Sequence, residues 1–238
     1  MISLKCGFVH VPRTGGASIR EALSNYSYIN NKGGHLGRGY MEDSLRMSHE
    51  KSNQYFWFAF VRNPWDRFVS AYEYLKRRNE SVGQRFARLT KPFKTFKDFV
   101  VNIDGAFVQN EIATTERAEG DNYMEFVKYR LGQADSFNKV LFNNRLAVST
   151  FIPHFSTQSM HLREGKSSKI KLDFIGRFEN LQEDFNRVCE SIGIEPIVLP
   201  RTNHSERKPY QEYYDEETRG IIFNEYYEDI KSFGYRYD

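Results

Sequence analysis

The chain has 238 residues, with 34 Lys and Arg against 31 Asp and Glu, so its formal net charge is +3. This length is that of one large domain or two small ones, and a hydrophobic content of 39% excludes a disordered chain. The small net charge argues against dedicated duplex-DNA binding, which usually leaves a strongly basic face. Two cysteines are too few for a disulfide framework or a four-ligand zinc site, which indicates a reducing compartment.

The first predicted elements are a strand, a turn and a helix. Residues 6–11 form a short apolar run that meets Pro12, which predicts a strand leading into a turn. Residues 17–23 carry apolar side chains at helical spacing and predict a helix. The chain shows no signal-peptide pattern and no window of 18 apolar residues, so we expect a cytoplasmic protein without a membrane span.

A second strand and helix follow in the same order. Residues 55–61 (YFWFAFV) form an uninterrupted apolar run, which is typical of a parallel strand buried on both faces. Asn63 suits an N-cap and Pro64 suits the first helical position, so a helix should begin there.

The pattern returns near the carboxyl end. Residues 172–176 predict another buried strand, followed by a helix that Gly193 ends and by a last helix that begins after Asp215. Recurring strand–turn–helix units predict an α/β fold, a single domain over residues 1–238 with a mainly parallel sheet flanked by helices. Residues 76–150 show weaker periodicity, and we interpret them as a helical insertion or cap on the acceptor side.

The turn after the first strand (FVHVPRTGGAS, residues 8–18) has the composition of a phosphate cradle. Its two glycines let backbone N–H groups approach an anion, and a helix N-terminus adds about half a positive charge. Arg13 adds a cation, while Thr14 and Ser18 add hydroxyls. No Lys-Ser/Thr pair follows Gly16, so the nucleotide-triphosphatase pattern does not match. An ordinary tight turn is the competing interpretation.

The turn after the second strand (FVRNPWDRFVSAY, residues 60–72) also suits phosphate. Arg62 lies at the carboxyl end of a strand, where open α/β sheets bind ligands, and Ser70 follows on the helix. Arginine with a hydroxyl makes a strong phosphate clamp. Alternatively, Arg62 and Arg67 merely pair with acids such as Asp66. Two such turns on neighbouring strands indicate one ligand with two separated phosphates.

These two turns resemble known motifs. PRTGGAS resembles the 5′-phosphosulfate loop of sulfotransferases, and RNPWDRFVSAY resembles their 3′-phosphate motif. The likeness is strongest to carbohydrate sulfotransferases, of heparan/chondroitin type and bacterial, which use 3′-phosphoadenosine 5′-phosphosulfate (PAPS). It continues in FIGRFENLQEDF and in the carboxyl-terminal run, and so touches residues 8–75 and 150–238. The resemblance implies a P-loop-like sulfotransferase fold, PAPS as donor, 3′-phosphoadenosine 5′-phosphate (PAP) as product, and no metal.

The resemblance also implies roles for single residues. The first turn would hold the 5′-phosphosulfate through Arg13, Thr14, Gly15, Gly16, Ala17 and Ser18. Arg62 and Ser70 would hold the 3′-phosphate. Arg13 stands where the family usually has lysine, and we expect it to assist the leaving oxygen. Gln158, Arg207 and Lys208 are further cofactor-binding candidates, with solvated loop residues as the alternative.

Sulfuryl transfer needs a base for the acceptor hydroxyl, and histidine titrates near neutrality. His35 lies in a Gly-rich loop (NNKGGHLGRGYM) where family members often carry a histidine, so we predict that it is the catalytic base. A surface histidine is the alternative. His10 is expected to be a structural hydrogen-bonding residue. His154 and His161 have no carboxylate at ligand spacing, so no metal site is expected.

The sequence therefore predicts a PAPS-dependent sulfotransferase that acts on a glycan or another hydroxylated acceptor. Two alternatives stay open: a nucleotide-dependent phosphotransferase, and a non-catalytic binder of nucleotides or sulfated glycans. The acids Glu179, Glu183 and Asp184 are expected on a solvated helix face, with a helix N-terminus as a second interpretation for Glu179.

The small net charge hides an uneven distribution. Residues 1–100 hold 17 basic and 8 acidic side chains, whereas residues 101–238 hold 17 and 23. Residues 76–97 hold eight basic residues against Glu80 alone. As a hypothesis, this run attracts an anionic acceptor; a solvated helical face is the alternative.

Overall fold

The computed structural model describes residues 2–30, 38, 41–42, 45–81, 93–103, 154–162, 170–202 and 207–238. The chain divides into two compact units, each with its own hydrophobic core. The first unit comprises Met1–Asn63 and Gln158–His204, and the second comprises Pro64–Thr157 and Ser205–Asp238.

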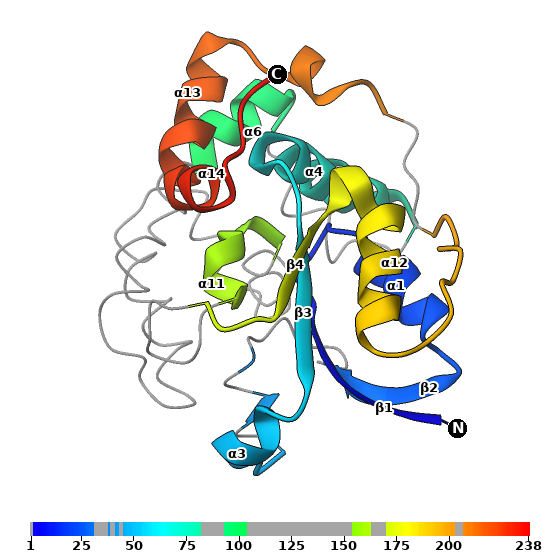
Figure 1. Ribbon diagram of the computed structural model, residues 1–238. Coiled ribbons are helices and arrows are strands. Elements are labelled where there is room, and N and C mark those ends of the chain that lie inside the picture. Colours follow the sequence, from blue (N-terminus) through cyan, green and yellow to red (C-terminus); the bar gives the residue numbers. More distant parts are fainter. Residues whose placement is uncertain are drawn as a thin grey trace. The chain divides into compact units, whose positions relative to one another are not determined.

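A parallel sheet forms the centre of the first unit (Figure 1). Its four strands are β1 (Ile2–Val9), β2 (Tyr26–Asn30), β3 (Phe56–Val61) and β4 (Phe174–Arg177). They lie in the order β2-β1-β3-β4, and each neighbouring pair is parallel. The predicted α/β fold with a mainly parallel sheet is confirmed.

Helices α1 (Gly16–Ala22) and α12 (Leu181–Ser191) pack on one face of this sheet, and α11 (Gln158–Leu162) lies on the opposite side (Figure 1). Alternate side chains of β1 and β3 meet the two helices in a buried cluster. Its members are Leu4, Cys6, Phe8, Ile19, Leu23, Phe58, Phe60, Phe185, Val188 and Cys189. On the other face, the Trp57 indole N–H donates to the Ser52 carbonyl at 3.0 Å, and the Arg38 guanidinium lies over its ring. Burial on both faces explains the uninterrupted apolar run of β3.

The predicted bounds differ from the observed ones mainly at strand ends. β1 begins at Ile2 and ends before His10, so the predicted strand at residues 6–11 was placed too late. The helix predicted at residues 17–23 is confirmed as α1, and the helix predicted to end before Gly193 is confirmed as α12. The half-buried strand β2, the short helix α3 (His49–Ser52) and α11 were not predicted, because their sequences lack a clear apolar period.

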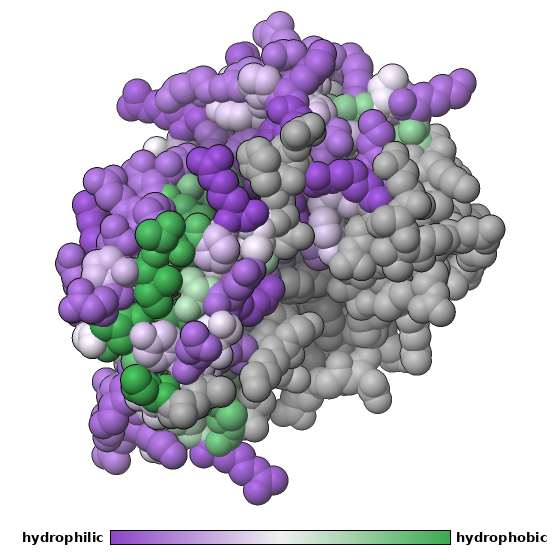
Figure 2. Space-filling view, turned by 90° about the vertical axis from the view of Figure 1, so that its right-hand side faces the viewer, coloured by the Kyte–Doolittle hydropathy of each residue, from purple (hydrophilic) through white to green (hydrophobic). Residues whose placement is uncertain are grey.

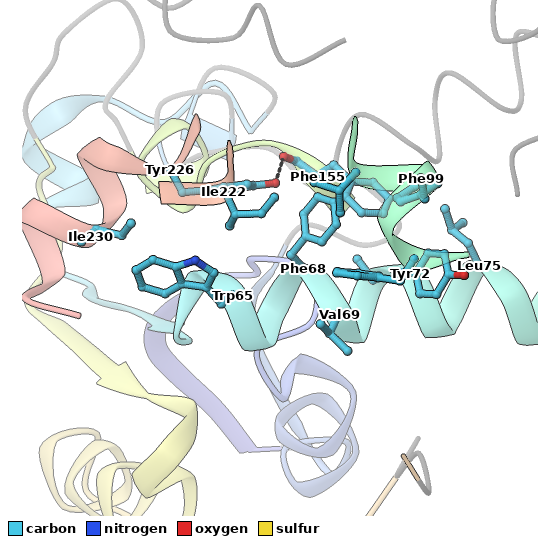
Figure 3. Packing of buried hydrophobic residues seen from close by; sticks show 13 residues of the cluster. Trp65, Phe68, Val69, Tyr72, Leu75, Phe99, Phe155, Ile222, Tyr226 and Ile230 are labelled. Atoms are coloured by element: carbon cyan, nitrogen blue, oxygen red, sulfur yellow. Dashed lines mark hydrogen bonds between the residues drawn. The ribbon is translucent and has the colours of Figure 1, made fainter. Parts of the chain in front are cut away.

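The described part of the second unit consists of α4 (Pro64–Ser81), α6 (Phe96–Ile103), α13 (Glu216–Glu225), α14 (Tyr227–Phe233), the 3₁₀ turn η3 (Tyr210–Tyr213) and the segments that connect them. Figure 3 shows how Trp65, Phe68, Val69, Tyr72 and Leu75 of α4 line its core, together with side chains from α6 and α13. α4 begins at Pro64, as predicted.

The carboxyl-terminal part of this unit is two helices where the sequence predicted one. α13 begins at the N-cap Asp215, whose carboxylate accepts from Thr218 N at 2.9 Å in a capping box. The helix ends at Tyr226, and α14 starts directly after it. The buried Tyr226 hydroxyl donates to the Phe155 carbonyl (Figure 3), which fixes this junction in the core.

The helical insertion predicted for residues 76–150 falls largely outside the described residues. Of this range, the structure describes the end of α4 and residues 93–103, which contain α6. The insertion and the single domain over residues 1–238 therefore stay predictions.

The surface of the first unit carries an apolar segment after α12. Ile192, Ile194, Ile197 and Leu199 pack against the core, while Val198 is 85% exposed. In Figure 1 this segment runs along the right-hand side, which faces the viewer in Figure 2. Figure 2 shows a strip of hydrophobic residues (green) among hydrophilic ones on that side. None of the helices in the described ranges is long and apolar enough to cross a membrane.

We expect both cysteines to resist thiol reagents in the folded protein. Cys6 and Cys189 are free and fully buried, and burial raises the pKa of Cys6 to about 12 because the thiolate would lose its hydration. At pH 8, labelling with a maleimide, followed by mass spectrometry, should leave both thiols unmodified until denaturant is added. Fast labelling of Cys6 in native buffer would contradict this burial.

Candidate functional site

The turn between β1 and α1 has an unusual backbone. Arg13 has a φ of 69°, in the left-handed region that residues with a Cβ rarely adopt, and Gly15, the N-cap of α1, has a φ of 87°. The buried Thr14 hydroxyl donates to the Val11 carbonyl at 2.8 Å and closes the turn. The two left-handed residues reverse the chain so that α1 starts directly beneath the loop.

Both glycines of this turn are in contact with other side chains. A Cβ on Gly15 would lie 2.6 Å from Cδ2 of Leu181, and a Cβ on Gly16 would lie 2.0 Å from Cδ2 of His10. From the sequence, we interpreted the two glycines as allowing backbone N–H groups to approach an anion. The structure adds a second reason, since a side chain at either position would require a neighbouring side chain to shift, and the positive φ of Gly15 is a further obstacle there.

The start of α1 supplies hydrogen-bond donors. The first bond of the helical ladder runs from Ile19 N to Gly15 O at 3.2 Å, so the N–H groups of Gly16, Ala17 and Ser18 have no acceptor within the helix. Groups of this kind bind phosphate and sulfate. The Ser18 hydroxyl forms a 2.9 Å hydrogen bond with the Thr202 hydroxyl.

His10 lies between this loop and the sheet with a defined tautomer. Its Nδ1 is 3.0 Å from Arg20 Nη1, and the ring is 7% exposed. A guanidinium only donates, so Nδ1 accepts and the ring proton resides on Nε2. This agrees with the predicted structural role of His10.

Arg62 follows β3, at the carboxyl end of the sheet, as predicted. Its backbone N–H donates to Gln158 Oε1 and its carbonyl accepts from Gln158 Nε2, both at 2.8 Å. The guanidinium lies 3.8 Å from the centre of the Phe178 ring, and its Nη1 donates to the Arg13 carbonyl at 3.1 Å. The two turns singled out in the sequence therefore meet through this side chain.

Gln158 thus holds the backbone of Arg62 from a fully buried position. Its contact with the cofactor stays a prediction. Phe178 was not among the predicted site residues, although it lies in FIGRFENLQEDF, a segment that carried the family resemblance.

Two of the acids expected on a solvated helix face accept backbone hydrogen bonds; Glu179 is exposed, as predicted, whereas Asp184 is not. Glu179, in the 3₁₀ turn η2 (Phe178–Asn180), accepts from the Asn63 backbone N–H at 2.7 Å. Asp184 is buried and accepts from the Arg177 backbone N–H at 2.7 Å. The prediction was wrong for Asp184, because its carboxylate satisfies the donor at the end of β4. Glu183 is exposed, as predicted.

The remaining candidates belong to the second unit. Ser70 is buried on α4. Arg207 forms an ion pair with Asp66, and both side chains are largely buried. Lys208 is exposed and lies 3.4 Å from Glu212. Asp66, which the sequence analysis considered as a partner of Arg62 or Arg67, pairs with Arg207.

The predicted base His35 lies outside the described residues, and its role stays a prediction. Within the described part of the chain, no cluster of three His, Cys, Asp or Glu side chains could hold a metal ion. His154 stacks on Tyr74 with ring centres 5.1 Å apart.

A parallel sheet with an anion-suited turn and an arginine at the ends of neighbouring strands is typical of α/β proteins that bind phosphorylated ligands. A comparison with family models places the chain more narrowly, since the model of the sulfotransferase family matches residues 8–236. The chain therefore belongs to the sulfotransferase family, and sulfuryl transfer is the activity of that family. Searches of curated proteins and of solved structures found no match.

Proposed function

We propose that this chain transfers a sulfuryl group from PAPS to a hydroxyl of a carbohydrate acceptor. The observation that carries the proposal is the 3.1 Å hydrogen bond from Arg62 to the Arg13 carbonyl. It joins the turn that resembles the 5′-phosphosulfate loop to the turn that resembles the 3′-phosphate motif. Backbone donors at the start of α1 and two arginines fit a nucleotide with two separated phosphates.

When bound, PAPS supplies the activated sulfuryl group. In the proposed reaction the acceptor oxygen bonds to sulfur, the bond from sulfur to the phosphate oxygen breaks, and His35 takes the hydroxyl proton. Arg13 and the N–H groups of Gly16–Ser18 stabilise the negative charge on the departing oxygen. Ser70, Arg207 and Lys208 are proposed to bind the 3′-phosphate together with Arg62.

The acceptor is proposed to be a glycan, and an anionic glycan is a narrower hypothesis based on the basic run at residues 76–97. One member of that run is already neutralised, because Lys97 Nζ lies 2.7 Å from Asp215 and 2.6 Å from Glu217. Lys97 is therefore a weak candidate for contacting the acceptor. The cytoplasmic location stays a prediction from the sequence.

Incubation with ³⁵S-labelled PAPS tests the proposal. The acceptors should include neutral glycans, acidic or sulfated glycans, and small hydroxylated metabolites. We expect label transfer to at least one glycan, and we expect His35→Ala to lower turnover about 100-fold or more while the affinity for PAP is kept, since a general base contributes about 10²–10⁴-fold.

The outcomes separate the three functions left open by the sequence. Absence of both transfer and PAP binding would exclude the proposed donor. Magnesium-dependent ATP binding would favour the phosphotransferase. PAP binding without transfer to any acceptor, unchanged in His35→Ala, would favour the non-catalytic binder.

A further inference from the structure

Arg62 is held by the protein at both its backbone and its guanidinium. The amide of Gln158 bonds both the N–H and the carbonyl of its backbone, each at 2.8 Å. The ring of Phe178 covers its guanidinium at 3.8 Å, and the whole residue is only 7% exposed. A long, flexible side chain is thereby restricted to one conformation, and it loses little further freedom when it forms hydrogen bonds.

Arg62 in turn holds a backbone carbonyl in the turn between β1 and α1. Arg62 Nη1 donates to the carbonyl of Arg13, the residue whose φ of 69° is unfavourable for a side chain with a Cβ. The left-handed conformation of Arg13 directs its carbonyl toward Arg62, and the charge-assisted hydrogen bond holds it there. Gly15 and the donors of α1 follow directly in the chain, so the geometry of Arg13 sets the start of the anion-binding turn.

We propose that Arg62 has a second role, in which it positions the 5′-phosphate loop through the Arg13 carbonyl, and that Phe178 and Gln158 are positioning residues for Arg62. This inference rests on the proposed function, because it concerns the same nucleotide site. Under it, binding of a 5′-phosphate depends on Arg62 even when the ligand has no 3′-phosphate. If Arg62 served the 3′-phosphate alone, a ligand without that phosphate would be insensitive to it.

Phe178→Leu tests the inference, with PAP and adenosine 5′-monophosphate (AMP) as paired probes in calorimetry. Leucine keeps an apolar side chain but removes the aromatic face. We expect the affinity for both nucleotides to fall, since apparent affinity scales with the fraction of protein whose loop has the binding geometry; a loop that is correct one time in ten gives about a tenfold loss. Phe178→Tyr keeps the ring and should retain AMP affinity near that of the natural chain.

Ser70→Ala is the matched comparison, since Ser70 is proposed to contact only the 3′-phosphate. This variant should lower the affinity for PAP and leave the affinity for AMP unchanged. Loss of PAP affinity alone in Phe178→Leu, with AMP unaffected, would overturn the inference. If Phe178→Leu does not fold, Arg62→Lys serves the same comparison, because lysine lacks the planar group that stacks on Phe178.

Backbone NMR of the ligand-free protein gives a second measurement. The amide resonances of Thr14 and Gly15 should shift in Phe178→Leu and stay in place in Phe178→Tyr, and unchanged resonances in both would contradict a positioning role. Failure of the proposed function looks different. A natural chain that binds both nucleotides but transfers no label would refute catalysis and leave this inference standing.

Discussion

Gly16→Ala should destabilise the chain because the new methyl group has no room. Its Cβ would lie 2.0 Å from Cδ2 and 2.3 Å from Nε2 of His10. The imidazole cannot easily move away, since it is buried and its Nδ1 is bonded to Arg20. Overpacking of this kind costs about 1–3 kcal/mol. We expect the free energy of unfolding in urea to fall by that amount, and PAP binding to weaken because α1 supplies the proposed donors.

The double variant His10→Ala/Gly16→Ala isolates the cause. Removing the imidazole makes room for the new methyl group, so the two substitutions should be non-additive by about 1 kcal/mol or more. Gly220→Ala is the matched control, because a Cβ there meets nothing within 4 Å and Gly220 lies inside α13. Alanine should be neutral or stabilising at that position. An equal loss for Gly16→Ala with and without His10 would show that the imidazole is not the obstacle.

The fold was predictable where one period dominates a segment. The apolar run of β3 and the N-cap and proline before α4 needed no knowledge of other elements. β2 is a half-buried strand that mixes polar and aromatic residues, so no alternation revealed it. The last helix was predicted without the break at Tyr226, because that break depends on a tertiary hydrogen bond to Phe155.

The site was predictable as two turns, but its internal contacts were not. The residue types of Arg13 and Arg62 indicated phosphate chemistry from the sequence alone. The residues that hold Arg62 could not be predicted, because Gln158 and Phe178 lie far from it in sequence and contact it only in the folded protein. The proximity of Leu181 to Gly15 could not be predicted for the same reason, because no local sequence pattern indicates it.

The helix that follows Arg62 carries a second arginine with a different role. Arg67 is 1% exposed and donates to the Ser156 carbonyl at 2.8 Å. Burial lowers the pKa of Arg67, while its electrostatic interactions with Tyr226 and Asp229 oppose that shift. Asp229 on α14 is fully buried as well. These interactions of Arg67 all lie within the second unit.

Asp229→Asn should therefore cost more than a surface substitution, because it removes a buried carboxylate whose charge favours the charged form of the buried Arg67. Removing the partner of a buried charge costs up to about 3–5 kcal/mol, which sets the upper end of the expected loss in the free energy of unfolding measured in urea at pH 7. Arg67→Met should also be costly, since it removes a cation that interacts electrostatically with the buried Asp229 carboxylate.

The double variant Arg67→Met/Asp229→Leu should lose less than the sum of the two single losses, because an apolar pair often replaces a buried ion pair at little cost. Lys97→Met is the matched control: Lys97 pairs with Asp215 and Glu217, but its side chain is 51% exposed, so the effect should be small. Single variants as stable as the natural chain would mean that Asp229 does not compensate the Arg67 charge. Strict additivity in the double variant would mean that the two residues act independently.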